Sequence, residues 1–277
     1  VFNYQTFFPS LKPLFDDIGA QVQCNWAHKE NDFLDFDKQY LIPHMESTRG
    51  PKIAVADVNK DGLDDLFVCG AAGQAGTLMI QSSAGKFNAT DTAVFAKSKQ
   101  SEGVDAVFFD ANNDGAPDLY VVSGGNQYDD GAPFLADHLY MNNGSGHFTE
   151  AASAIPPMLK NKSCVTVADI DKDGDMDLFV GGLADDKRYG IAQPSYLLLN
   201  DGKGIFKPAD VSVIRSDNLG IVTSASFTDI NNDGWNDLLV AGEWMGVKIF
   251  INKNGRFTAS EIPASTGLWQ TMYTTDV

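Results

Sequence analysis

Short apolar stretches alternate with polar turns along most of this chain, and they fall into groups of four. The first group comprises residues 53–56, 66–70 and 77–81 and a stretch that ends at Phe87, each containing Val, Leu, Ile or aromatic side chains. Asn, Ser and Gly residues separate the third and fourth stretches of the groups, which is typical of a β-hairpin. Helical periodicity is weak, so the pattern predicts four short antiparallel strands in each group.

An acidic nonapeptide follows the first strand of every group. It reads D-x-[DN]-x-D-G-x-x-D and occupies residues 57–65, 110–118, 169–177 and 229–237, so that successive copies begin 53, 59 and 60 residues apart. This period suits four strands per unit, whereas a calcium-binding β-helix repeats about every nine residues. Asp276 and Val277 match the first two residues of the motif, which predicts the start of a fifth copy at residue 276.

The repeats predict an all-β fold, namely a β-propeller of four-stranded antiparallel blades. One such unit cannot form a core alone, and radial stacking buries the faces of successive units against each other. A β-sandwich is the alternative, but a sandwich does not require a regular repeat. Four complete repeats indicate a fragment or partial ring of a larger propeller, which we expect to self-associate through its exposed blade edges.

The sequence divides into two regions. Residues 51–277 carry the propeller repeats, whereas residues 1–50 form an N-terminal segment that lacks the acidic motif. Some apolar residues of this segment are candidates for strands of an incomplete earlier blade, and they are Phe33, Phe36, Tyr40, Leu41 and Ile42.

The nonapeptide places oxygen-bearing side chains at positions 1, 3, 5 and 9 around a glycine at position 6. Calcium takes six to eight oxygen ligands at about 2.3–2.6 Å, and a curled loop can direct alternate side chains toward one ion. Glycine permits the positive φ of such a curl, and the carbonyl group at position 7 can supply a further ligand. The predicted ligands are Asp57, Asn59, Asp61, Leu63, Asp65, Asp110, Asn112, Asp114, Ala116, Asp118, Asp169, Asp171, Asp173, Asp175, Asp177, Asp229, Asn231, Asp233, Trp235 and Asp237.

Three alternatives to this calcium site are less consistent with the pattern. An EF-hand needs a glutamate at position 12, but that position holds Val68, Val121, Val180 and Val240. A solvated turn would explain a single copy, and Mg²⁺ would require octahedral geometry. Four copies in one register favour about four Ca²⁺ ions, which would reduce the formal net charge from −17 to −9 and relieve the repulsion between clustered carboxylates.

Composition and motifs exclude several function classes. The formal net charge of −17 argues against nucleic-acid binding, and no apolar run approaches the ~18 residues of a membrane-spanning helix. Three cysteines are too few for a disulfide framework in a chain of this length. No Ser-His-Asp order, nucleophile elbow or HExxH motif indicates catalysis. His28 and His44 flank an acidic stretch, but no third metal ligand lies at helical or strand spacing.

The repeats resemble the FG-GAP or VCBS repeats of integrin-α-like propellers. The likeness covers residues 51–277 and rests on the acidic loop, the strand that follows it and the hairpin N-x-G-x-G-x-F at Asn142–Phe148 and Asn200–Phe206. It implies that the loops bind Ca²⁺ between the first and second strands on the lower face, and that they stabilise blades rather than catalyse a reaction. Residues 28–65 are also similar to large repeat-containing surface or secreted proteins of Bacteroidetes-type bacteria. Propellers of this family commonly have seven blades, so the four complete repeats of this sequence are fewer than the resemblance implies.

The loops between second and third strands are expected on the opposite, upper face. These loops are long in the second and third repeats, and long loops on a rigid scaffold commonly carry binding function. Aromatic side chains beside polar ones can stack on a sugar or hold a peptide, although some of them can instead pack against neighbouring blades. The candidate ligand-binding residues are Asn126, Tyr128, Arg188, Tyr189 and Trp244.

We therefore expect a non-catalytic, calcium-stabilised binding module with a glycan or protein ligand on its upper face. Calcium sites of modest affinity are filled where the ion is abundant, and extracellular modules work at roughly 10⁻⁴–10⁻³ M, so we expect an extracellular, cell-surface or periplasmic location. Two other classes stay open. One is a polysaccharide-acting lyase or hydrolase built on a propeller, and the other is a purely structural spacer.

Overall fold

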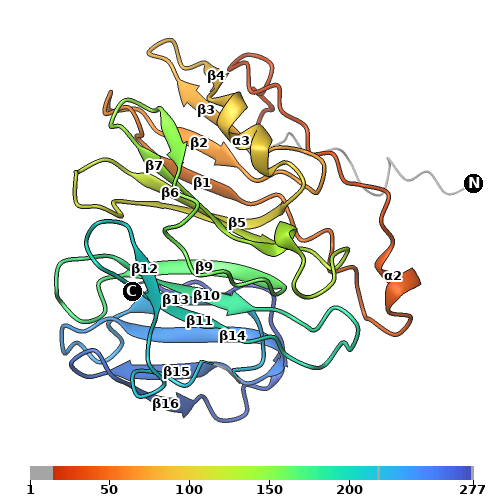
Figure 1. Cartoon of the computed structure of the whole chain (residues 1–277), viewed down its shortest axis with the longest axis vertical. Coiled ribbons are helices and arrows are strands. Elements are labelled where there is room, and N and C mark those ends of the chain that lie inside the picture. The colour runs from red at the N-terminus through yellow and green to blue at the C-terminus, as the bar shows by residue number, and fades with distance from the viewer. Residues whose placement is uncertain (1–14, 217–218, 276–277) are drawn as a thin grey trace, which may run out of the picture.

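Four antiparallel sheets follow one another along the chain and account for most of its regular structure. A computed structural model describes residues 15–216 and 219–275. Each sheet has its strands in sequence order, as expected for a propeller blade. Figure 1 shows the blades stacked from β1–β4 at the top to β13–β16 at the bottom. The all-β propeller prediction is thereby confirmed at the level of its blades.

The strand bounds agree with the sequence pattern. Blade one contains β1 (Ile53–Ala56), β2 (Asp65–Val68), β3 (Thr77–Gln81) and β4 (Phe87–Thr90), and blade two contains β5 (Glu102–Phe109), β6 (Asp118–Gly124), β7 (His138–Asn142) and β8 (Phe148–Glu150). Blade three contains β9 (Lys162–Ala168), β10 (Asp177–Gly182), β11 (Tyr196–Asn200) and β12 (Phe206–Pro208). Blade four contains β13 (Ile221–Thr228), β14 (Asp237–Met245), β15 (Lys248–Asn252) and β16 (Phe257–Glu261), and the short β17 (Gly267–Leu268) pairs with β14.

The core lies between successive blades, because alternate residues of a strand face opposite sides of its sheet. In β6, Leu119 and Val121 pack against blade one, whereas Tyr120 packs toward blade three against Leu178 and Val180. Every residue of β6 is buried. The first strands also contact one another, from β1 to β5, from β5 to β9 and from β9 to β13, so they form the inner edge of the array.

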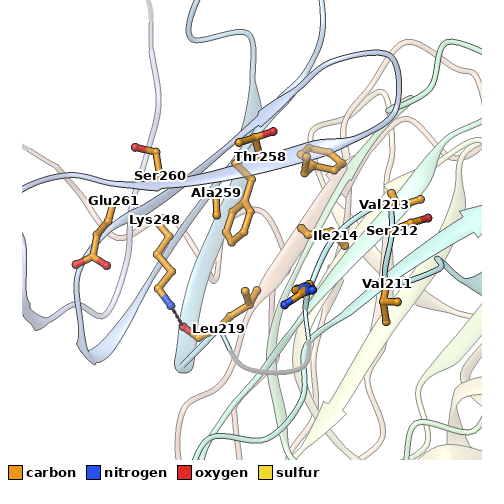
Figure 2. A pocket seen from close by; sticks show the side chains of 13 residues that line it. Val211, Ser212, Val213, Ile214, Leu219, Lys248, Thr258, Ala259, Ser260 and Glu261 are labelled. Atoms are coloured by element: carbon orange, nitrogen blue, oxygen red, sulfur yellow. Dashed lines mark hydrogen bonds between the residues drawn. The ribbon is translucent and has the colours of Figure 1, made fainter.

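The linkers between blades fill the outer part of this core to different extents. After blade one, α3 (Thr92–Phe95) places the ring of Phe95 within 5.1 Å of that of Phe67 and 5.0 Å of that of Tyr140. After blade three, the linker leaves a groove of about 760 Å³ against β15 and β16. Figure 2 shows this groove, with Lys248 Nζ donating a hydrogen bond to the Leu219 carbonyl oxygen at 2.7 Å.

The N-terminal segment differs from the strands expected for it. Within residues 15–50 it contains only the one-turn helix α2 (Asp35–Lys38), with no strand, and residues 1–14 lie outside the described part of the chain. Leu41 and Tyr40 are largely exposed, whereas the buried side chain of Asp35 accepts hydrogen bonds from Ser47 and from Asn126 Nδ2. Long-range polar contacts with the upper face therefore hold residues 35–47 of this segment, and earlier in the segment the Val22 carbonyl oxygen accepts a bond from the Phe87 amide of β4 at 2.8 Å.

The end of the described chain lies beside the inner strand of blade four. Thr223 Oγ1 donates to the Trp269 carbonyl oxygen at 2.6 Å, Ser224 Oγ accepts a bond from the Met272 amide at 3.1 Å, and Ser226 Oγ lies 3.0 Å from Thr274 Oγ1. Residues 269–275 form no strand, and the predicted start of a fifth copy at Asp276 and Val277 lies outside the described residues. Among the described residues, no helix has the length and apolar character needed to cross a bilayer.

Candidate functional site

All four acidic loops join a first strand to a second strand, and they adopt one conformation at one end of the blades, here called the lower face. In blade one, the amides of Asp61 and Gly62 donate to the two carboxylate oxygens of Asp57 at 3.0 and 2.8 Å. The Leu63 amide donates to Asp61 Oδ1 at 2.9 Å. Corresponding bonds to the first and fifth residues recur in blades two and four, and in blade three as well, except that the Lys172 amide there takes the place of the position 5 amide at Asp169 Oδ1. The loops are therefore curled as the nonapeptide predicts.

Backbone conformation explains two positions of the motif. The glycine at position 6 has a positive φ in every loop, for example 86° at Gly62 and 95° at Gly174, as expected. Position 4 also has a positive φ, with values of 61° at Lys60, 60° at Asn113 and 62° at Lys172. This positive φ was not predicted, because position 4 holds Lys in two loops and Asn in the other two, and only Asn is enriched in this conformation.

The ninth-position aspartate is buried beneath each loop. In blade two, Asp118 is inaccessible to solvent, its Oδ2 accepts the Ala111 amide at 3.0 Å, and its Oδ1 accepts the Asn142 amide from the third strand at 2.7 Å. The same pair of contacts occurs at Asp65, Asp177 and Asp237. This residue thus connects the loop to the third strand of its own blade.

An asparagine then connects each of the first three loops to the next blade. Asn142 Nδ2 donates to the Val58 carbonyl oxygen in the blade-one loop at 2.8 Å, and Asn252 Nδ2 donates to the Ile170 carbonyl oxygen in the blade-three loop at 2.7 Å. Asn142 opens a copy of the hairpin motif that was noted in the sequence, and Asn252 holds the same place in blade four. Their role in joining blades was not predicted, since it depends on contacts across more than 80 residues.

Blade three shows how closely the carboxylates approach. One ligand atom each from Asp169, Asp171 and Asp177 lies within 4.8 Å of the others. Their hydrogen bonds within the described chain come from backbone amides, such as those of Ile170, Asp173 and Gly174. Burial, together with the neighbouring carboxylates Asp171 and Asp173, raises the pKa of Asp177 to about 7. Burial likewise raises the pKa of Asp118 to about 6. A bound cation would favour the ionised forms, so the donor set fits a hard, oxygen-seeking ion.

On the upper face the structure brings together two of the five candidate ligand-binding residues. Trp244 Nε1 donates to Tyr189 Oη at 2.9 Å, and Tyr189 Oη donates to the buried carboxylate of Glu243. Trp244 is 61% exposed although it lies within β14, and its φ is +57°, which is unusual for a bulky residue. Such outliers cluster at functional sites.

The other three candidates lie in different settings. Asn126 is buried and anchors the N-terminal segment, because its carbonyl oxygen accepts a bond from Lys38 Nζ at 2.9 Å and its side chain bonds Asp35. Tyr128 donates to the Gln100 carbonyl oxygen, and its ring lies 5.0 Å from that of Phe134. The side chain of Arg188 is 71% exposed and pairs with Asp185 at 3.1 Å.

A polar cluster below Tyr189 was not identified from the sequence as a unit. Arg49 donates from Nε to Glu46 Oε2 at 2.7 Å and from Nη2 to Glu243 Oε1. His44 Nε2 lies 3.0 Å from Glu243 Oε1. Burial raises the pKa of Glu46, whereas for Glu243 the opposing effect of burial is overcome by the hydrogen bond from Tyr189 and the charge of Arg49, so its pKa is lowered. No local pattern could reveal this cluster, because Arg49 and Glu243 are 194 residues apart.

Repeated four-stranded blades with one acidic loop each define this molecule as a β-propeller-like repeat protein. The chain belongs to the FG-GAP-like repeat family, whose model matches residues 57–121, 110–180 and 229–277. The resemblance to FG-GAP repeats is thereby confirmed. No curated protein matches the sequence.

Solved structures provide distant similarities. The crystal structure of the V. cholerae biofilm matrix protein Bap1 is 14% identical, with a TM-score of 0.35 over 75% of this chain and 30% of that chain. The structure of a "putative exo-beta-1,3-galactanase from Bifidobacterium bifidum s17" is 12% identical, with a TM-score of 0.40 over 72% of this chain and 65% of that chain. This chain thus spans less than two thirds of the length of either protein.

Proposed function

We propose that this chain is a non-catalytic, calcium-stabilised binding module of an extracellular or cell-surface protein. The calcium part rests on the four acidic loops, which hold carboxylates at positions 1 and 5 and a buried aspartate at position 9 in one repeated conformation. The side-chain ligands would come from positions 1, 3, 5 and 9, with the position 7 carbonyl oxygen as a further ligand. The ion would neutralise carboxylates that otherwise repel one another.

The observation that carries the binding role is the exposed Trp244 on the upper face. Its indole is fixed to Tyr189 Oη, while its backbone has a strained positive φ. An aromatic side chain held rigidly in solvent offers contact area at a low entropic cost, and such residues stack on sugars or anchor peptides. We therefore place the glycan or protein ligand on the face opposite the acidic loops.

A thermal melt in millimolar Ca²⁺, repeated after chelation, tests the calcium part. Binding to the native state adds RT ln(1 + [L]/Kd) per site, so four sites at ten-fold excess over Kd would contribute about 5–6 kcal/mol. We expect a large decrease in Tm on chelation that is reversed by Ca²⁺. A melt that does not change, in a sample shown by metal analysis to contain no calcium, would contradict the proposal.

A glycan and peptide screen in Ca²⁺, with Trp244→Ala as the variant, tests the binding part. Trp235→Ala is the matched control, since that indole lies on the lower face over Lys172, with Nζ 4.2 Å from its ring centre. We expect ligand affinity to fall at least about ten-fold for Trp244→Ala, which corresponds to 1.4 kcal/mol, and to be unchanged for the control. Equal affinities of both variants for a ligand that the wild type binds would reject the upper face.

One observation favours a polysaccharide-acting enzyme as a second candidate. Glu46 and Glu243 are both buried and both contact His44 and Arg49, which line a cavity of about 390 Å³. Enzymes that cleave glycosidic bonds commonly use a pair of carboxyl groups. Release of sugars from an acidic polysaccharide by the wild type, with loss of release in Glu243→Gln, would favour this class over a binding module.

A further inference from the structure

The cluster of His44, Glu46 and Glu243 lies at the upper end of the inner strands, next to a cavity of about 390 Å³. Val104 of β5, Ser163 of β9 and Thr223 of β13 line this cavity, so it lies where the first strands of three blades converge. His44 comes from the N-terminal segment and Glu243 from blade four. The cluster therefore forms only when the segment is docked on the blades.

The distances within the cluster suit a small cation. His44 Nε2 lies 3.2 Å from Glu46 Oε1 and 3.0 Å from Glu243 Oε1. In a tetrahedral zinc site with bonds of 2.0–2.1 Å, neighbouring ligand atoms are about 3.3 Å apart. The imidazole nitrogen thus lies at ligand spacing from both carboxylate oxygens, and all three atoms lie within 4.8 Å of one another.

The hydrogen bonding of the cluster is incomplete within the described chain. Glu46 is 1% exposed, and its Oε1 accepts no hydrogen bond from any described residue. His44 Nε2 also lies 3.1 Å from the donor Arg49 Nη2. If Nε2 carries a proton, two donors face each other; if it does not, its lone pair faces two carboxylate oxygens. Either protonation state leaves one unfavourable contact, which a metal cation between the three atoms would remove.

We propose that His44, Glu46 and Glu243 bind a divalent transition metal ion of the zinc class. Imidazole and carboxylate together suit zinc better than calcium, which prefers oxygen ligands alone. Three protein ligands would leave one coordination position for water or a ligand group, and one of the three, His44, lines the cavity. This site is distinct from the acidic loops, and it does not depend on calcium binding there.

Side chains around the three ligands would orient them. Tyr189 Oη donates to Glu243 Oε2, Gln270 Nε2 donates to Glu243 Oε1 at 3.0 Å, and Arg49 Nε holds Glu46 Oε2. Hydrogen bonds of this kind fix carboxylate ligands, and their loss typically weakens metal binding 10–100-fold. Arg49 leaves Glu46 Oε1 free, whereas its Nη2 donates to Glu243 Oε1, so the ion would replace this guanidinium nitrogen as the cation on Glu243.

Titration with Co²⁺ in the presence of millimolar Ca²⁺ tests the proposal, because Ca²⁺ keeps the acidic loops occupied and Co²⁺ reports its coordination by visible absorption. We expect one Co²⁺ per chain with a d–d band of a four- or five-coordinate ion, displaced by Zn²⁺. His44→Ala and Glu243→Gln should each weaken binding more than about 100-fold, beyond the loss caused by orienting residues. Tyr189→Phe should weaken it by about 10-fold, since it removes one orienting hydrogen bond.

His147→Ala is the matched control, because that imidazole is 66% exposed and contacts only Asp91 among the carboxylates of the described chain. It should bind Co²⁺ like the wild type. Melts in Ca²⁺ will show whether each variant is folded, and Glu243→Gln retains the size of the side chain if His44→Ala is unstable. Absence of a d–d band in the wild type, or Co²⁺ affinity in Glu243→Gln equal to that of the wild type, would overturn the proposal.

Discussion

Asn200 of blade three donates a hydrogen bond from Nδ2 to the Ala111 carbonyl oxygen of the blade-two loop, at 2.8 Å. The same amide group also donates to the Met176 carbonyl oxygen in its own blade, at 3.2 Å. One side chain thereby joins two acidic loops, which begin at Asp110 and Asp169, and Asn200 lies 89 residues after Ala111 in the sequence. The stability of one loop is therefore coupled to the packing of the next blade.

Replacing this asparagine should destabilise the whole array. Asn200→Ala leaves two buried carbonyl groups without a donor, and such a loss costs about 1–3 kcal/mol. We expect a lower midpoint in urea, measured in millimolar Ca²⁺. Asn143→Ala is the control, because Asn143 bonds only its own exposed turn through the Ser145 amide and hydroxyl. A midpoint for Asn200→Ala equal to that of the control would argue against the coupling.

Calcium stoichiometry should depend on position within a loop. Asp61 lies at position 5 with its Oδ1 bonded to the Leu63 amide, whereas Asp64 lies at position 8 and is not a predicted ligand. Asp61→Asn should therefore remove about one bound Ca²⁺ per chain, since it deletes a ligand charge. Isothermal titration calorimetry measures the number of sites. Asp64→Asn changes the net charge equally and should keep the full number; a loss of one ion in both variants would instead indicate a general charge effect.

The buried pair Lys162 and Asp137 should be sensitive to loss of one partner. Lys162 Nζ lies 3.3 Å from Asp137 Oδ1 and donates to the carbonyl oxygens of Leu135 and Met158 at 2.6 and 2.7 Å, with no exposure of either charged side chain. Lys162→Met would leave a buried carboxylate without its cation, which typically costs 3–5 kcal/mol. Chemical denaturation should show this loss.

A neighbouring lysine provides the comparison for this pair. The side chain of Lys160 is 39% exposed and pairs with Asp130 at 2.7 Å. Exposed ion pairs contribute about 0–1 kcal/mol, so Lys160→Met should have a small effect. Similar losses of stability in Lys162→Met and Lys160→Met would show that burial of Lys162 does not determine its contribution to the free energy of unfolding.

Glu102 should make stability depend on pH. Burial raises the pKa of Glu102 from 4.5 to about 8, although Gln127 donates a hydrogen bond to it. The folded chain therefore keeps a proton that the unfolded chain releases near pH 4.5, so the free energy of unfolding falls as pH rises from about 4.5 to 8. The slope from this group is about 1.4 kcal/mol per pH unit, and it vanishes above pH 8.

Glu102→Gln removes the ionisation but keeps the size of the side chain and an acceptor for Gln127. In Ca²⁺, we expect this variant to be more stable than the wild type at pH 8, with the difference shrinking toward pH 5. Denaturation midpoints at several pH values measure it. A difference that is constant with pH would show that Glu102 does not titrate in this range.

Repeating local patterns made the blades and loops predictable from the sequence. Each strand is specified by its own apolar residues, and the turn at Gly62 depends on a residue within the loop, so neighbouring positions carry enough information. The polar cluster could not be predicted in this way. His44 and Glu243 belong to different elements that meet only after the N-terminal segment docks. Their contact therefore cannot be predicted from the spacing of ligands along one strand or helix.

The N-terminal segment illustrates a second limit. Its aromatic and aliphatic residues suggested strands, yet Leu41 is exposed while the polar Asp35 and Gln39 are buried. Gln39 bonds the Asp185 carbonyl oxygen and accepts the Tyr189 amide, so its burial is satisfied by loops of blade three. Hydrophobicity predicts burial in a core, but it does not predict which polar residues find partners on a distant surface.

The asparagines that join the blades all point the same way along the chain. Asn142, Asn200 and Asn252 each hold the loop of the blade before their own. The contacts between blades therefore all have the same direction along the chain. A force that peels blade four away would first break the Asn252 contact to the loop of blade three and then expose the next joint, whereas peeling from blade one would break the joints in the reverse order. The force needed to separate the blades should therefore depend on whether the chain is pulled from blade one or from blade four.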